Sequence, residues 1–109
     1  MAIELKFKSG GTDAIAADAD FQSDRIDISL NYVWVVTSKS SGIVGGPGTY
    51  SIEVSDDDGV NWETYPGAGG IAIGTSFKAD CLQWTSMRIN YLKATTTAGT
   101  VTFPLTLKR

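Results

Sequence analysis

Hydrophobic and polar residues alternate at every second position in three stretches of the chain. These stretches are Thr49–Ser55, Met87–Lys93 and Val101–Lys108. A β-strand turns successive side chains to opposite faces, so each stretch would place apolar side chains on one face and polar side chains on the other. Pro104 lies within the last stretch and has no N–H for a sheet hydrogen bond. We therefore expect that strand to run along an edge at Pro104 or to be bulged there.

Further strands are expected between and before these three. Val33–Ser38 is apolar on both faces, which indicates a central strand or a strand covered by a partner. The alternation within Ile3–Phe7 indicates an N-terminal strand. Shorter strands are expected at Arg25–Ser29, Asn61–Tyr65 and Thr75–Lys78. The pattern thus predicts about eight short strands.

Glycine-rich and polar segments separate the expected strands. Asp57-Asp58-Gly59 predicts a hairpin turn, because Gly59 readily takes the positive φ that such a turn needs. Ser38–Gly48 and Pro66–Gly74 are expected to be loops that are long for simple hairpins. We expect Ser9–Phe21 to be irregular.

The spacing of apolar residues shows no sustained helical period, and short β-branched runs recur along the chain. This pattern predicts an all-β fold, an antiparallel β-sandwich of jelly-roll-like form. The chain has 109 residues, of which 42% are hydrophobic and 19% charged. We therefore expect one domain over residues 1–109 with a hydrophobic core of its own.

The charge pattern bears on the class of partner. The net charge is −3 and the nine basic residues are scattered, which disfavours binding to nucleic acid or to an anionic membrane surface. The longest uninterrupted apolar run, Val33–Val36, is too short to span a bilayer. The first residues lack the apolar segment of a signal peptide. We expect a protein made in the cytoplasm, with no nucleic-acid or membrane partner.

The residue types that perform most catalysis at neutral pH are scarce. Histidine is absent and Cys81 is the single cysteine, so neither a Ser-His-Asp triad nor a zinc site of Cys and His can form. The acidic run Asp56–Asp58 lacks the alternating spacing of a calcium loop, and a solvated hairpin turn explains it better. We expect no enzymatic activity, no catalytic residue, no metal and no cofactor.

Trp34, Trp62 and Trp84 are many tryptophans for a chain of this length. Exposed tryptophans serve as platforms for sugar rings or as hot spots at protein interfaces, whereas buried ones fill a core. We favour the core for Trp62 and Trp84. Trp34 lies on the strand that is apolar on both faces, which leaves core and subunit interface open. The candidate interface consists of apolar residues of that strand and of the two glycine-rich loops, namely Trp34, Val36, Ile43, Val44, Ile71 and Ile73.

Several segments resemble, in the same order, parts of small β-sandwich virion proteins of tailed bacteriophages. Ser55–Trp62, with Asp58-Gly59 inside it, resembles a hairpin seen in many of these proteins. Leu82–Tyr91 is similar to the strand that follows the hairpin. Asp24–Ile28 and the last segment from Gly99 fit the same layout. The hairpin pattern also occurs in discoidin-like and carbohydrate-binding sandwiches.

The resemblance implies a non-enzymatic structural protein of a phage particle. Such a protein would be a capsid decoration or cement protein, or a neck or tail component, and would bind neighbouring capsid or tail subunits. Proteins of this kind usually work as symmetric oligomers, so the resemblance implies a homo-oligomer located in the virion. The alternative function is that of a carbohydrate-binding module, which would recognise glycans through surface aromatic residues.

Overall fold

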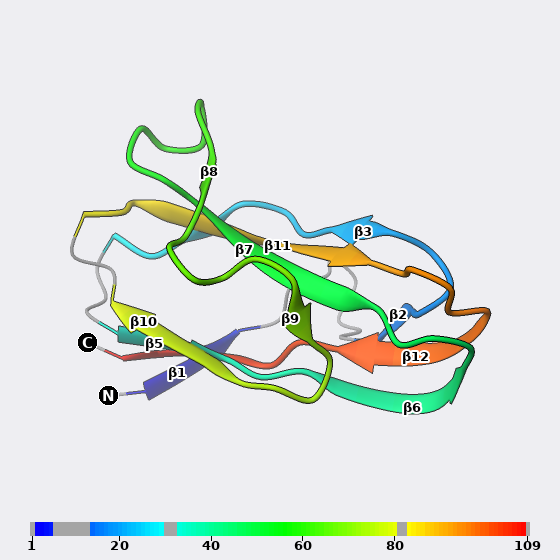
Figure 1. The fold of residues 1–109 in the computed structure, drawn as a ribbon. Helices are drawn as coiled ribbons and strands as arrows, with labels where there is room; N and C mark the ends of the chain where they lie inside the picture. The colour runs from blue at the N-terminus through cyan, green and yellow to red at the C-terminus, as the bar shows by residue number, and fades with distance from the viewer. Residues whose placement is uncertain (1, 6–13, 30–32, 81–82, 109) are drawn as a thin grey trace.

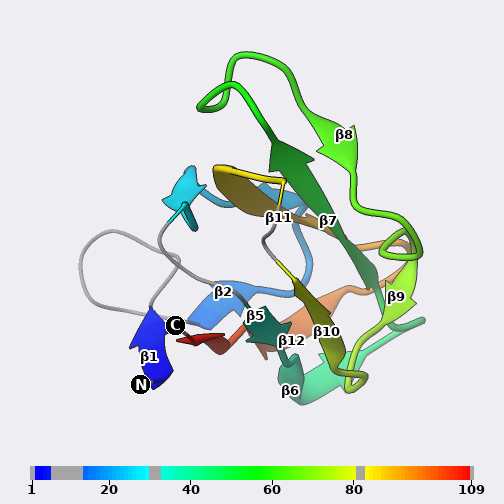
Figure 2. The ribbon, with the colours of Figure 1, turned by 90° about the vertical axis from the view of Figure 1, so that its left-hand side faces the viewer.

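The structure is a computed structural model that describes residues 2–5, 14–29, 33–80 and 83–108. The strands of these residues lie in two layers (Figures 1 and 2), and the pairs they form are antiparallel. The antiparallel, sandwich-like all-β fold expected from the sequence is thereby confirmed. Cys81 and Phe7, the last residue of the expected N-terminal strand, lie outside the described residues.

The first layer contains two sheets that continue one another. Their strand orders are β1-β13-β5-β10 and β2-β12-β6. The strands are β1 (Ala2–Leu5), β2 (Ala14–Ala16), β5 (Val33–Val36), β6 (Lys39–Val44), β10 (Phe77–Asp80), β12 (Ala98–Thr102) and β13 (Leu105–Lys108). Only two residues separate β5 from β6, and two separate β12 from β13. The two sheets therefore lie end to end along the lower side of Figure 1.

The second layer is a single sheet around two long strands. Its order is β3-β11-β7-β8, and β4 pairs with β11 while β9 pairs with β7. The strands are β3 (Phe21–Gln22), β4 (Ile26–Asp27), β7 (Thr49–Ser55), β8 (Glu63–Thr64), β9 (Ile71–Ala72) and β11 (Ser86–Leu92). β7 forms as the sequence predicts, and β11 begins and ends one residue earlier than expected. The two strands pair over their full length.

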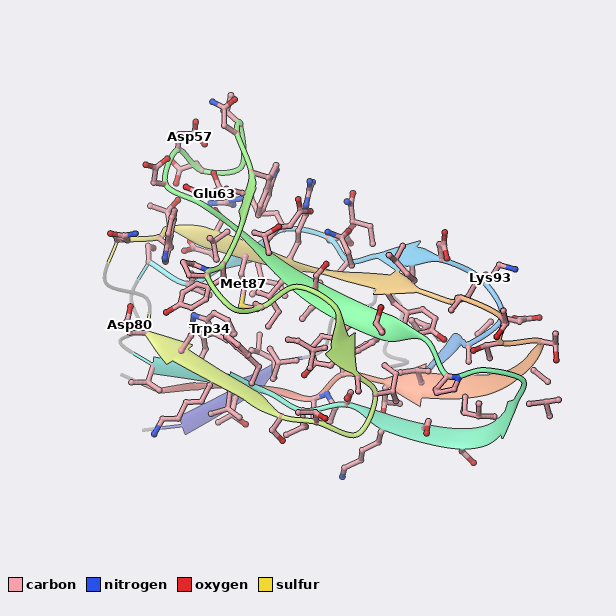
Figure 3. The ribbon with its side chains drawn as sticks, viewed as in Figure 1. Trp34, Asp57, Glu63, Asp80, Met87 and Lys93 are labelled. Carbon is pink, nitrogen blue, oxygen red and sulfur yellow. The ribbon has the colours of Figure 1, made fainter. Side chains whose placement is uncertain are left out.

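The core lies between the two layers. Trp34 of β5 and Met87 of β11 enter it from opposite layers, and both side chains are fully buried (Figure 3). The Trp34 ring meets the Tyr65 ring edge to face, with centroids 5.4 Å apart. Its Nε1 donates a 3.2 Å hydrogen bond to the carbonyl oxygen of Asp80. A large aromatic side chain is thus buried with its polar atom satisfied, which makes it strongly stabilising.

The apolar strand Val33–Val36 is a central strand, one of the two alternatives left open by the sequence. β5 lies between β13 and β10 in its sheet. Its inward side chains are buried, and Val33 and Val35 on the outer face are half-buried.

The last alternating stretch does not form one strand, so that expectation is wrong. It breaks at Phe103 and Pro104, where the chain leaves the sheet of β2 and β6 and joins the sheet of β1 and β5. Pro104 lies in the break, and its carbonyl oxygen accepts a 3.0 Å hydrogen bond from the Thr37 N–H. Val101, Phe103 and Leu105 are all buried. The apolar alternation therefore continues across a break that the missing N–H of proline allows.

Three short strands lie in segments that were expected to be loops or irregular. They are β2 within Ser9–Phe21, β6 within Ser38–Gly48 and β9 within Pro66–Gly74. Among the described residues β6 has one neighbouring strand, β12, and most of its side chains are exposed. An edge strand of this kind has no reason to alternate, which explains why the sequence pattern missed it.

A β-bulge shapes β6. Val44 lies opposite Ala98 and Ser41 opposite Thr100, so three steps along β6 match two steps along β12. Gly42 has a φ of +66°, which glycine adopts without steric cost. A bulge increases the local bend of the strand that carries it, so the outer edge of β6 is bent rather than flat.

Candidate functional site

Two of the six candidate interface residues belong to the core. Trp34 and Val36 have no exposed surface in this chain. Inward positions of a central strand face the opposite layer, so these side chains cannot touch a partner while the domain is folded. The structure therefore corrects their assignment to the interface.

The other four candidate residues lie at or near the surface. Ile43, Ile71 and Ile73 are half-buried and pack against the core, and Val44 is 56% exposed. Ile43 and Ile73 line one pocket of about 230 Å³. Its other lining residues are Ser40, Pro47, Gly48 and Tyr91. The structure thus brings together two side chains that lie thirty positions apart in the sequence.

This pocket adjoins a strand edge that carries no neighbour in the described part of the chain. β10 pairs with β5, from Phe77 opposite Val36 to Asp80 opposite Val33. In the described part of the chain, β6 pairs only with β12. Figure 1 shows that β6 extends beyond the end of β10. We refer to the outer edge of Lys39–Val44 and the 230 Å³ pocket together as the β6 seam.

A row of polar side chains crosses the outer face of the second layer. Arg88 Nε donates a 2.8 Å hydrogen bond to Glu53 Oε1, and the same oxygen accepts a bond from Asn90 Nδ2. Gln22 Nε2 donates a 2.7 Å bond to Asn90 Oδ1. The Arg88 guanidinium lies 4.2 Å from the centre of the Trp62 ring, in a cation–π contact. The row thereby links β3, β11, β7 and the hairpin that follows β7.

The polar row ends at a shallow pocket between β3 and β11, of about 360 Å³, which we name the β3–β11 pocket. It is lined by Asp20, Phe21, Gln22, Asn90, Tyr91 and Leu92. Asp20 Oδ1 accepts a 2.9 Å hydrogen bond from the Lys93 N–H. Leu92 is 56% exposed. Amide, carboxylate and apolar side chains therefore share one small surface.

The tryptophans differ in their surroundings. Trp84 is buried, in agreement with its expected place in the core, and its accessible edge lines a pocket of about 290 Å³ with Tyr65. Trp62 is half-buried and lies with Arg88 on the outer face, so its expected place in the core is wrong. Of the three tryptophans, Trp62 has the most exposed side chain.

The acidic run forms the tip of the β7–β8 hairpin (Figure 3). The Asp57 carboxylate accepts hydrogen bonds from the Asn61 N–H at 2.9 Å, the Ser55 hydroxyl at 2.6 Å and the Asn61 side-chain amide at 2.6 Å. These bonds lower the pKa of Asp57 to about 2, and the bond from the Asn61 N–H has the largest effect. Gly59 has the expected positive φ, +93°, and Asp58 also has one, +61°. The carboxylate of Asp57 therefore stabilises the turn through these hydrogen bonds.

The sequence predicts that three members of the polar row lie on the polar faces of their strands, but it does not predict that these residues meet. Arg88, Asn90 and Glu53 each occupy a polar position in an alternating stretch. They meet because the register of β11 against β7 places Arg88 opposite Glu53. That register depends on the whole sheet, so no local signal could have assembled the row.

Comparison with known proteins assigns the chain to no family. No family model matches it, and no curated protein matches it. In the part of the chain that the structure describes, no helix has the length and apolar character needed to cross a membrane.

Proposed function

We propose that the chain is a non-enzymatic structural protein of a phage particle that binds neighbouring subunits through the β6 seam. The decoration, cement, neck and tail types all fit this role. The observation that carries the proposal is the seam itself, a strand edge that no other strand of the described residues pairs with, beside an apolar pocket. The resemblance of the Ser55–Trp62 hairpin to small virion proteins supplies the phage context.

The chemistry of the seam suits an extended segment of another subunit. A free strand edge offers N–H and C=O groups to a further strand, and pockets beside it select the side chains of that strand. The pocket between Ile43 and Ile73 holds about 230 Å³. This exceeds the ~150 Å³ of an apolar cavity that accommodates benzene. One aliphatic or aromatic side chain of a partner would fit, and the partner would also cover Val44.

The same edge carries features that restrict indiscriminate pairing. Edge strands are commonly protected by lysine and by bulges, which repel or misalign unsuitable partners. In β6, Lys39 stands at one end and the Gly42 bulge lies in the interior. A partner must therefore match the bend of β6, which favours a specific neighbour over chance aggregation.

A binding experiment with matched variants tests the proposal. Particles assembled without the protein are mixed with the purified chain and sedimented. Val44→Lys places a charge on the exposed end of β6, and Val60→Lys places the same charge on the 77% exposed Val60 of the hairpin tip. We expect wild type and Val60→Lys to sediment with the particles, and Val44→Lys to bind about tenfold less tightly.

Two results would argue against this function. One is a wild-type chain that stays monomeric and does not bind to the particles. The other is an equal loss of binding in both lysine variants, since that would remove the special role of the β6 seam.

A further inference from the structure

The β3–β11 pocket has the size of a small-ligand site. Its volume of about 360 Å³ falls within the range of roughly 300–1,000 Å³ that is typical of such sites. The pocket of the β6 seam holds about 230 Å³ and the pocket beside Trp84 about 290 Å³, so both are smaller. The β3–β11 pocket is distinguished from them by the side chains that line it, as well as by its size.

The polar groups of this pocket are held in place by hydrogen bonds to other groups of the chain. Gln22 is bonded to Asn90, and Asn90 is bonded in turn to Glu53. The Lys93 N–H orients the Asp20 carboxylate. Groups fixed in this way lose little further freedom when a ligand binds, which favours affinity.

These groups retain hydrogen-bonding capacity toward a ligand. A carboxamide has two N–H donors and a carbonyl acceptor, and an ionised carboxylate has about four acceptor positions. In its bond to Asn90 the Gln22 amide uses one N–H, and Asp20 accepts one bond from Lys93. Donors and acceptors thus remain side by side, which suits hydroxyl groups, because a hydroxyl donates and accepts at once.

Apolar surface lies next to the polar groups. The register of β3 against β11 places Phe21 opposite Tyr91 beside the pairing of Gln22 with Asn90. Phe21 packs inward against the core, whereas Leu92 lies on the same outer face of the sheet as Asn90 and is largely exposed. A ligand that satisfies the whole pocket carries several hydroxyls together with an apolar C–H face. The carboxylate of Asp20 disfavours an anionic ligand.

From these features we propose that the β3–β11 pocket binds an uncharged sugar residue of a glycan. Gln22, Asn90 and Asp20 hydrogen-bond its hydroxyls, and Leu92 contacts its C–H face. Glycan recognition was expected, as an alternative function, through surface aromatic residues, whereas this site uses none of the three tryptophans. The pocket lies on the second layer and β6 in the first, so this inference does not depend on the proposed function.

The test begins with the purified full chain on an array of neutral and sialylated glycans. The strongest neutral binder is then titrated by calorimetry against two pairs of variants. Gln22→Ala removes an exposed amide of the pocket, and Gln83→Ala removes an exposed amide beside Trp84. Leu92→Ala is paired with Val60→Ala, since both residues are exposed and apolar. All four are surface changes, and circular dichroism verifies that each variant is folded.

We expect Gln22→Ala and Leu92→Ala each to raise the Kd about five- to tenfold, and both control variants to stay within about twofold of wild type. Binding to no glycan on the array, or to sialylated glycans only, overturns the inference. A Kd that rises in Gln83→Ala but not in Gln22→Ala overturns the inference as well. The Gln22→Ala variant should bind particles as tightly as wild type does. If the glycan inference fails, subunit binding through the β6 seam can therefore still be tested separately.

Discussion

At the scale of single residues, burial separates tryptophans that look alike in the sequence. Trp34 has no exposed surface and bonds the Asp80 carbonyl oxygen, while Trp62 is half-buried under Arg88. The sequence could not decide whether Trp34 lies in the core or at a subunit interface, because a central strand and a partner-covered strand are both apolar on two faces. Only the position of β5 between two other strands resolves the choice.

This difference predicts unequal effects of two alanine substitutions. Trp34→Ala should lower the free energy of unfolding by about 3–5 kcal/mol, because it leaves a large cavity between the layers. Trp62→Ala should cost much less, because the surface can relax around it. Urea unfolding measures both variants. Equal losses, or a Trp34→Ala variant as stable as wild type, would contradict the place of Trp34 in the core.

Asp57 gives the hairpin tip a dependence on pH. Its ordinary pKa of 3.8 falls to about 2 in the folded chain, so folding favours the ionised form. The resulting stabilisation is present above about pH 4 and is lost as the pH falls through 3.8 toward 2. The pKa of Asp27 is also lowered, chiefly by the Ser29 hydroxyl, and contributes in the same direction.

We therefore expect Asp57→Asn to melt at a lower temperature than wild type at pH 6, and the difference to shrink as the pH approaches 2. Asp56→Asn removes a carboxylate from the neighbouring position of the turn and serves as the control. Thermal unfolding followed by circular dichroism at several pH values measures the difference. A gap between Asp57→Asn and wild type that stays constant with pH would contradict the role of the Asp57 carboxylate in the turn.

At the scale of elements, strands with one buried face could be predicted and edge strands could not. β7 and β11 follow their apolar alternation because each buries one face against the first layer. The hairpin turn was predictable too, since its chemistry is local to Asp57 and Gly59. β6 shows no such pattern, because its shape depends on a bulge and on close packing against β12.

That close packing makes Gly99 a sensitive position. A Cβ at Gly99 would lie 2.8 Å from Ile43 Cδ1 and 2.9 Å from the Ser41 carbonyl oxygen, and the φ of Gly99 is +115°. Gly67 also has a positive φ, +82°, but a Cβ there would meet no atom within 4 Å. Both positions therefore carry the cost of a positive φ, and a clash is added only at Gly99.

Gly67→Ala should destabilise the chain by about 1–2 kcal/mol, the cost of a left-handed conformation. Gly99→Ala should cost about 3 kcal/mol or more, because overpacking against β6 adds to that strain. Denaturant unfolding of both variants compares them directly. If Gly99→Ala cost no more than Gly67→Ala, the tight contact between β12 and the β6 bulge would be contradicted.

At the scale of the whole molecule, the two layers carry different surfaces. The first layer presents the β6 seam, with Ile43, Ile73 and Val44, and the second presents the polar row and the β3–β11 pocket. The sequence indicated three apolar residues of the seam, Ile43, Val44 and Ile73, but neither pocket, because each pocket joins segments that only the fold brings together. We propose that the seam binds subunits and that the pocket binds a neutral sugar.

Amide hydrogen exchange of the chain, free and bound to particles assembled without it, tests the role of the seam most directly. We expect peptides that contain Lys39–Val44 to exchange more slowly in the bound state, because a partner strand would bond the edge of β6 that pairs with no strand in the described part of the chain. Peptides that contain β8 (Glu63–Thr64), an edge strand of the other layer, should be unchanged. Unchanged exchange in Lys39–Val44 together with protection elsewhere would contradict subunit binding through the β6 seam.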